Sequence, residues 1–334
     1  MAVLQYLFDR FSLALIATVA LASLWPAEGH AAVWLDHVTT AGIALLFFLH
    51  GARLPREAIL AGLAHWRLHL TVLAATFVLF PVVGLAMQPL AGVLLTPQLY
   101  LGVLFLCALP STVQSSIAFT SIARGNIAGA VVAASLSNLA GVFFTPLLAG
   151  VLLTAQDGPG SPWQAIGDIL LLLLAPFVIG HLLRPWIGGW VKQRARLLSF
   201  TDQGTILLIV FGAFSAAVVE GLWRLTPLPA LLGLLLVCCI LLALVMSIIW
   251  FATGRLGFGH KDRITILFCG SKKSLATGIP MANILFAGNP TLGMIVLPVM
   301  LFHQLQLMVC AVLAQYFARQ AAAQAITTRA PGSQ

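Results

Sequence analysis

Two adjacent lysines, Lys272 and Lys273, stand inside an otherwise apolar stretch that runs from residue 264 to residue 286. A charged loop at residues 260–263 precedes them. Lys272 therefore lies about ten residues, or about 15 Å of helix, into this segment, near the middle of a bilayer. A charge at that depth costs several kcal/mol unless it faces water, a ligand or a partner. The spacing therefore predicts a functional site at these lysines.

The sequence offers no carboxylate at the same depth to neutralise the lysines. The acids Asp36, Asp168, Asp202 and Glu220 all fall toward the ends of apolar segments. A buried ammonium without such a partner either loses its proton or binds an anion. Consecutive helical residues point about 100° apart, so one lysine can face a cavity while the other packs between helices. The expected chemistry is attraction of an anion, and the sequence leaves open which lysine provides it.

Helix breakers and small polar residues surround the lysines and recur near Pro110. Broken helices in a membrane are tolerated where they are buried in protein or line a cavity. Their freed carbonyls can bind a cation and their freed N–H groups an anion. The alternative is that these side chains only satisfy the broken backbone. The candidate binding residues are Pro110, Ser111, Thr112, Gln114, Ser115 and Ser116 at the first interruption and Ser271, Lys272, Lys273, Ser274 and Thr277 at the second.

Three further polar side chains are expected near the same depth. Asn138 follows the pair Gly125-Asn126 by about 12 residues, and His303 and Gln304 follow Gly288-Asn289 by about 15 residues, which is about half of a membrane span. Gln306 lies close by. These residues either complete the site or form hydrogen bonds between helices, and both readings stay open.

Composition identifies an all-α polytopic membrane protein. The chain has 334 residues, of which 60% are hydrophobic and 8% charged, and its mean hydropathy is +1.04. These values exclude an ordinary soluble domain. The net charge of +8 comes from basic residues in short loops, which set topology and do not indicate a nucleic-acid partner. No nucleotide-binding or catalytic motif stands in a fitting context, so we expect no enzyme activity, cofactor or metal site.

Ten membrane spans are predicted from the apolar segments. With the N-terminus inside, 14 of the 17 basic residues fall on the cytoplasmic side, so both termini are expected in the cytoplasm and the protein in the inner (plasma) membrane. The first span also resembles a cleavable secretory signal, but the even span count favours its retention. The predicted spans are approximately 11–26, 33–51, 69–87, 98–121, 126–153, 163–187, 203–221, 228–253, 264–286 and 291–317.

The spans divide into two halves of five at the loop 158–162, so the second half enters the membrane from the opposite side. The fourth span of each half carries a polar break that begins at a cysteine, Cys107 or Cys269, and each ends in a Gly-Asn pair. We therefore predict inverted repeats at 1–157 and 158–320, with discontinuous helices 4 and 9 crossing at the midplane, as in secondary transporters. Residues 321–334 are predicted to form a disordered tail.

The motifs at these breaks resemble those of the bile acid:sodium symporter family, and in particular the branch similar to sodium/bile acid cotransporter 7. The resemblance rests on Phe-Cys-Gly-Ser-Lys-Lys-Ser-Leu-Ala-Thr-Gly-Ile-Pro at 268–280, on Pro-Ser-Thr-Val-Gln-Ser-Ser at 110–116 and on Gly125-Asn126. It implies a panel domain of spans 1, 2, 6 and 7. It also implies a core domain of spans 3–5 and 8–10, in which spans four and nine cross.

The sequence departs from the sodium-binding pattern that the resemblance implies. Phe268 stands where sodium-using members carry a carboxylate, and Ala130 and Ala134 replace hydroxyl residues of span five. A lysine ammonium in a cation site can do the electrostatic work of the ion that it displaces. The departures argue against two-sodium coupling, and sodium stays only one of the coupling ions that the sequence leaves open.

We therefore expect a secondary active transporter that moves a small organic anion across the lipid bilayer by alternating access, with midplane lysines replacing a coupling sodium ion. Three alternatives stay open: a proton- or cation-coupled exchanger of the same fold, a non-transporting membrane regulator of ion signalling, and a membrane enzyme. The sequence does not distinguish a monomer from a homodimer. It also does not specify the substrate, the coupling ion or the direction of transport.

Overall fold

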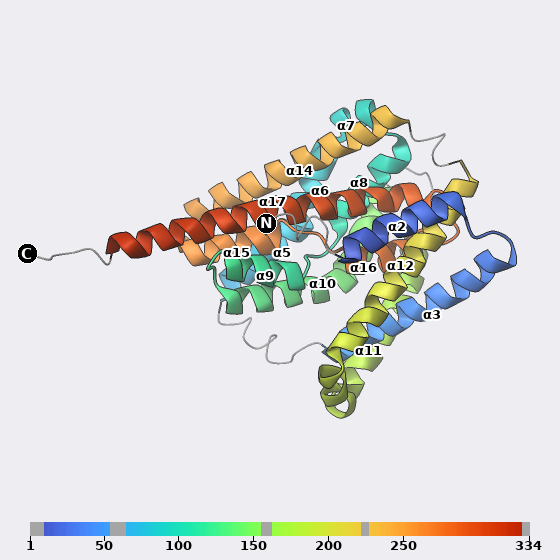
Figure 1. Cartoon of the computed structure of the whole chain (residues 1–334), viewed down its shortest axis with the longest axis horizontal. Helices are drawn as coiled ribbons and strands as arrows, with labels where there is room; N and C mark the ends of the chain where they lie inside the picture. Colours follow the sequence, from blue (N-terminus) through green and yellow to red (C-terminus); the bar gives the residue numbers. More distant parts are fainter. Residues whose placement is uncertain (1–9, 54–64, 155–161, 222–226, 329–334) are drawn as a thin grey trace, which may run out of the picture.

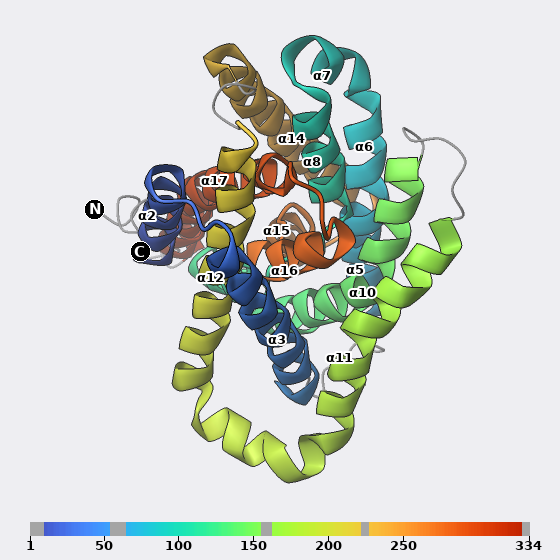
Figure 2. The same cartoon turned by 90° about the vertical axis from the view of Figure 1, so that its right-hand side faces the viewer.

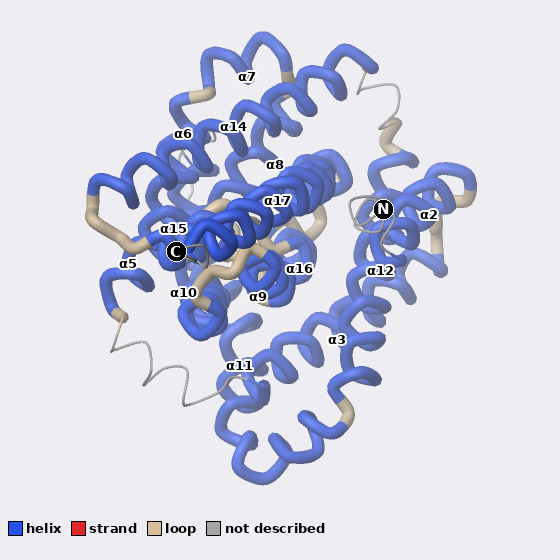
Figure 3. The backbone as a smooth tube through the Cα atoms, turned by 60° about the vertical axis from the view of Figure 1, so that its left-hand side comes forward, coloured by secondary structure: helices blue, strands red, loops and turns tan. Residues whose placement is uncertain are grey.

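The computed structural model describes residues 10–53, 65–154, 162–221 and 227–328. These ranges consist of helices joined by short loops and turns and contain no strand (Figure 3). The elements are α2 (Arg10–Leu24), α3 (His30–Arg53), α5 (Trp66–Ala74), the π-helix η1 (Ala75–Leu79), α6 (Phe80–Ala86), α7 (Gln88–Leu94), α8 (Pro97–Ala108), α9 (Gln114–Ile122), α10 (Ile127–Thr154), α11 (Pro162–Gln193), α12 (Ala195–Val219), α14 (Leu228–Arg255), α15 (His260–Gly270), α16 (Leu275–Leu285) and α17 (Leu292–Thr328).

Each predicted span overlaps one of these helices or a consecutive set of them. Six stretches of the described chain are individually long and apolar enough to cross a membrane. The predicted fourth and ninth spans fall short of that length because each is divided into two shorter helices, α8 with α9 and α15 with α16. For the described residues the all-α class is confirmed, as is the presence of several helices that are long and apolar enough to cross a membrane. The six stretches are His30–Arg53, Trp66–Ala86, Ile127–Leu152, Leu197–Val219, Leu228–Arg255 and Leu292–Ala322.

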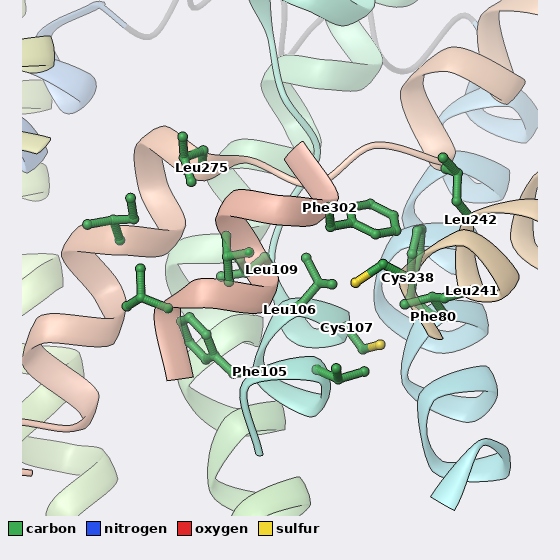
Figure 4. Packing of buried hydrophobic residues seen from close by; sticks show 14 of the residues in the cluster. Phe80, Phe105, Leu106, Cys107, Leu109, Cys238, Leu241, Leu242, Leu275 and Phe302 are labelled. Atoms are coloured by element: carbon green, nitrogen blue, oxygen red, sulfur yellow. The ribbon is translucent and has the colours of Figure 1, made fainter. Parts of the chain in front are cut away.

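Two groups of helices can be followed in Figure 1. Helices α5–α10 and α14–α17 pack around one another, whereas α3 lies along α11 and α12, and α2 lies along α12. The groups meet where α10 contacts α11 and where α12 contacts α16 and α17. Apolar side chains from all helices of the larger group fill its interior, and Figure 4 shows some of them gathered around the end of α8. This packing holds the ends of α8 and α15 in the protein interior.

Two predicted boundaries differ from the structure. The basic segment expected as a loop between the sixth and seventh spans is helical, because α11 continues to Gln193 and α12 begins at Ala195. In Figure 2 the last part of α11 turns toward α12, and Pro185 lies inside this helix, where proline commonly causes a kink. The segment predicted as a tail begins within α17, which extends to Thr328, and residues 329–334 lie outside the described residues. Both segments are rich in helix-forming Ala, Arg, Lys or Gln. The predicted loop 158–162 lies outside the described residues except for Pro162.

The close crossing of α3 and α11 gives a first testable prediction. Cβ atoms added to Gly51 and Gly180 would collide with the carbonyl oxygens of Phe177 and Phe48, respectively. Backbone cannot move aside cheaply, so Gly180→Ala is expected to cost at least about 1–3 kcal/mol, the usual range for overpacking. Gly189→Ala on the same helix is the matched control, since its added Cβ meets nothing within 4 Å. Melting temperatures of both purified variants test this; equal values would contradict the close crossing.

Candidate functional site

The two helix interruptions lie against each other in the interior. The first separates α8 from α9 at residues 109–113, and the second separates α15 from α16 at residues 271–274. The Ser274 N–H donates to the Pro110 carbonyl at 2.8 Å. In the opposite direction, the Ser111 hydroxyl donates to the Cys269 carbonyl at 2.5 Å. Each break therefore supplies donors for carbonyls that the other break has freed.

Lys273 is completely hydrogen-bonded although it is buried. Its Nζ donates to the carbonyl oxygens of Thr76, Cys107 and Leu109 at 2.8, 2.8 and 2.7 Å. The same nitrogen lies 4.1 Å from the centroid of the Phe80 ring. An ammonium has three N–H donors, so these three carbonyls satisfy it. Three converging carbonyl oxygens are also the ligands that a hard cation prefers, and here the lysine nitrogen occupies their centre.

The Thr76 carbonyl is a ligand that the sequence analysis did not include. Thr76 lies in η1, where the α-helical hydrogen-bond ladder is interrupted by one π-helical turn. In this register the Phe80 N–H bonds the Ala75 carbonyl, five residues earlier, and the Thr76 carbonyl would be bonded by residue 81, which is a proline without an N–H. Such π-turns occur frequently at functional sites because they release backbone groups. Pro81 within an apolar segment is the one sequence signal that indicates this release.

Lys272 is buried equally deeply but its nitrogen is unpaired. Its side chain is 0% exposed, and Nζ has no hydrogen-bond partner in the described part of the chain. The nitrogen lies 4.0 Å from the centroid of the Phe119 ring and 5.8 Å from that of Phe268. A desolvated cation–π contact contributes about 2 kcal/mol, which does not replace three lost hydrogen bonds to water. Of the two lysines, Lys272 is the one with free capacity to hold an anion.

The remaining hydroxyls of the predicted site differ in their hydrogen-bond partners. Ser271 bonds the carbonyl of Leu267 in its own helix, and Ser274 caps α16 by accepting from the Thr277 N–H, so both satisfy broken backbone. Thr112 lies 2.7 Å from the hydroxyl of Ser115 and 3.1 Å from that of Ser116, and Ser116 donates to the Phe268 carbonyl. The Thr277 hydroxyl is buried without a partner among the described residues. Gln114 is exposed, so the structure does not bring it into this cluster.

Gln306 on α17 holds the second interruption in place. Its Oε1 accepts from the Lys273 N–H, and its Nε2 donates to the Lys273 carbonyl, both at 2.8 Å. His303 lies 3.0 Å from the same Nε2 through its Nδ1. Gln304 is half-buried on this helix, and Asn138 on α10 buries an Oδ1 that has no hydrogen-bond partner among the described residues. Gln306 is therefore the glutamine of α17 that binds the backbone of Lys273 through both its N–H and its carbonyl.

Helix α10 supports the first interruption with residues that the sequence analysis missed. The Ser137 hydroxyl accepts from the Ser111 N–H at 3.1 Å, and the Thr145 hydroxyl donates to the Ala108 carbonyl at 2.9 Å. Gly141 lies between them, and an added Cβ there would come within 2.5 Å of the Pro110 ring. The spacing of Ser137, Gly141 and Thr145 at four-residue intervals places them on one helical face, which is a signal that the sequence does contain.

Comparison with known proteins assigns the chain to a family. A family model described as the SBF-like CPA transporter family matches residues 9–319. The chain belongs to this family. The description of this family names transporters, so membership agrees with the expected role in membrane transport and confirms the family resemblance noted from the two interruptions.

Three relatives show how similar the chain is to proteins of known sequence. It is 59% identical to "Uncharacterized protein PA2026" of Pseudomonas aeruginosa over 95% of each chain. It is 54% identical to "Putative symporter YfeH" of Escherichia coli over 94% of each chain. It is 27% identical to "Sodium/bile acid cotransporter 7" of Rattus norvegicus over 91% of each chain. Two of these three names describe a transporter, one as a symporter and one as a cotransporter.

Proposed function

We propose that the protein is a secondary active transporter that moves a small organic anion by alternating access, with Lys272 attracting the anion and Lys273 replacing a coupling sodium ion. The observation that carries the proposal is the different pairing of the two buried ammonium groups. Lys273 Nζ is bonded to three carbonyls, whereas Lys272 Nζ is unpaired within the described residues. A fixed positive charge at Lys273 takes over the role of an ion, and the free charge at Lys272 is left for a substrate.

The proposal includes a topology of ten spans in two inverted repeats, residues 1–157 and 158–320. In this topology, α8 with α9 and α15 with α16 are the two discontinuous helices that cross. The protein lies in the inner (plasma) membrane, with both termini in the cytoplasm. Spans 1, 2, 6 and 7 form the panel domain, and spans 3–5 and 8–10 form the core domain. The hydrogen bonds between the two interruptions support this proposal, as does the separate packing of α2, α3, α11 and α12.

The experiment that tests the proposal is uptake and binding with sodium or potassium as the only cation. The purified full chain is reconstituted in liposomes and offered taurocholate and succinate, and ligand-induced thermal stabilisation is measured in parallel. We expect the stabilisation and the uptake of the accepted anion to be equal in the two salts, because Lys273 already provides the cationic charge. A saturating anion at 100 times its Kd stabilises the protein by about 2.7 kcal/mol, which thermal unfolding resolves.

Two other results would point to the alternatives. Strict dependence on sodium would mean that a cation still binds elsewhere and that the protein is a cation-coupled carrier or exchanger of the same fold. Absence of uptake together with absence of stabilisation by any tested anion would favour a membrane regulator that acts through partners.

A further inference from the structure

A cavity of about 990 Å³ opens between the two groups of helices, away from the lysines. Its walls come from α3, α11 and α12 on one side and from α16 and the segment before α17 on the other. It lies at the end of the bundle where α3 begins and α12 ends, opposite the C-terminal end of α17 (Figure 1). Cavities of about 300–1,000 Å³ hold drug-sized ligands.

The charged residues that the described part of the chain contributes to this cavity all have the same sign. Glu28 comes from the α2–α3 connection, Asp36 from the first turns of α3, and Glu220 from the end of α12. The cavity lining includes no lysine, arginine or histidine, and none of the three acids forms an ion pair within the described part of the chain. Their combined field attracts a cation and repels an anion.

The inner wall of the cavity is apolar, with one exception. Ile43, Pro176, Ile209 and Ala213 contribute hydrocarbon. Ser215 also lines the cavity, is 1% exposed, and its hydroxyl has no hydrogen-bond partner among the described residues. A buried hydroxyl left unpaired is costly, so a ligand that offers it a polar atom gains that energy.

We propose that this cavity binds an amphipathic organic cation, such as a protonated or quaternary amine that carries an apolar body. The apolar body lies against the inner wall, and the cationic group lies among Glu28, Asp36 and Glu220. A bare metal ion does not fit the same residues, because the described residues contain no group of three His, Cys, Asp or Glu side chains placed to hold one. The proposal concerns a second site and does not depend on the action of Lys272.

Equilibrium binding of tritiated 4-phenylbutyltrimethylammonium to the full chain in nanodiscs tests the proposal, with empty nanodiscs as the blank. The neutral tert-butyl analogue has the same shape and serves as the uncharged competitor. We expect the analogue to compete at least about tenfold more weakly, since three partly exposed charges together contribute about one tenfold step in affinity. The triple variant Glu28→Gln, Asp36→Asn, Glu220→Gln is expected to lose this preference for the cation.

Three further variants keep the test decisive. Asp262→Asn removes an acid that is bonded to Asn126 outside this cavity, and Lys272→Met alters the other site; both are expected to bind the cation like the wild type. Ala44→Trp places an indole in part of the cavity but keeps the acids, and is expected to weaken the binding of both the cation and the neutral analogue even if the triple variant does not fold. Equal affinity of cation and neutral analogue, or wild-type binding by Ala44→Trp, would overturn the proposal.

Discussion

The Lys272→Met variant is expected to remain folded and to melt at or above the wild-type temperature, while it binds organic anions about 10- to 150-fold more weakly. Methionine keeps most of the side-chain volume and suits the contacts with the Phe119 and Phe268 rings. The substitution removes a buried nitrogen that has no hydrogen-bond partner within the described residues, and such a group is destabilising. The loss of affinity follows from removal of a hydrogen bond to a charged group, which contributes about 1.5–3 kcal/mol.

The measurements are thermal unfolding in detergent and anion-induced stabilisation of the same samples. Lys261→Met is the matched control, because Lys261 is an exposed lysine at the start of α15, outside the buried cluster. It is expected to leave both readouts unchanged. If Lys272→Met bound anions normally and was strongly destabilised, then Lys272 would be a structural residue and the anion would bind elsewhere.

The positions of the helices could be predicted from the sequence because local composition determines them. Apolar runs place the helices, and Pro110 and Gly270 mark where two of these helices are interrupted. The ends of helices were harder to predict where a helix continues past its apolar segment. The basic residues after Arg184 are predicted to lie in a loop, but α11 continues through them to Gln193. A positive charge excludes a residue from the bilayer centre but does not exclude it from a helix.

The choice between neighbouring residues could not be predicted. Lys272 and Lys273 are the same residue type at the same depth. Their surroundings differ because the turn of the chain after α15 directs Lys273 toward backbone carbonyls and Lys272 toward aromatic rings. Gln304 and Gln306 differ for the same reason, since only the packing of α17 decides which side chain reaches the Lys273 backbone. Tertiary geometry, absent from any local pattern, sets these assignments.

The proposed anion site and the proposed cation cavity differ in their electrostatic preference. Glu28, Asp36 and Glu220 disfavour an anion at the cavity, whereas the unpaired ammonium of Lys272 favours one in the interior. Neither lysine lines the cavity. A bound amphipathic cation would offset the charge of these acids and would not occupy the position of Lys272. Anion binding in the presence of phenylbutyltrimethylammonium is therefore expected to be equal or stronger, and not competitively weakened.

Removal of the Lys273 side chain is expected to make the stability of the protein depend on sodium. Lys273→Ala leaves the carbonyls of Thr76, Cys107 and Leu109 buried without their donor. Each unsatisfied carbonyl costs about 1–3 kcal/mol, so a decrease of several kcal/mol in unfolding free energy is expected in a salt whose cation does not fit. The space vacated by the side chain is lined by hard oxygen ligands, which a small cation with bound water can use.

We therefore expect Lys273→Ala to melt well below the wild type in choline chloride and to recover part of that loss in sodium chloride. The wild type should show no such difference, because its ammonium already occupies the position. Lys273→Met is the matched comparison: it fills the space with a side chain that cannot donate, so it should be destabilised in both salts without rescue. Gln306 and the Ser274 N–H bond backbone atoms, so these hydrogen bonds do not require the Lys273 side chain and are expected to remain in each variant. If sodium stabilised Lys273→Ala and Lys273→Met equally, the effect would be a general salt effect, and Lys273 would not stand in the place of an ion.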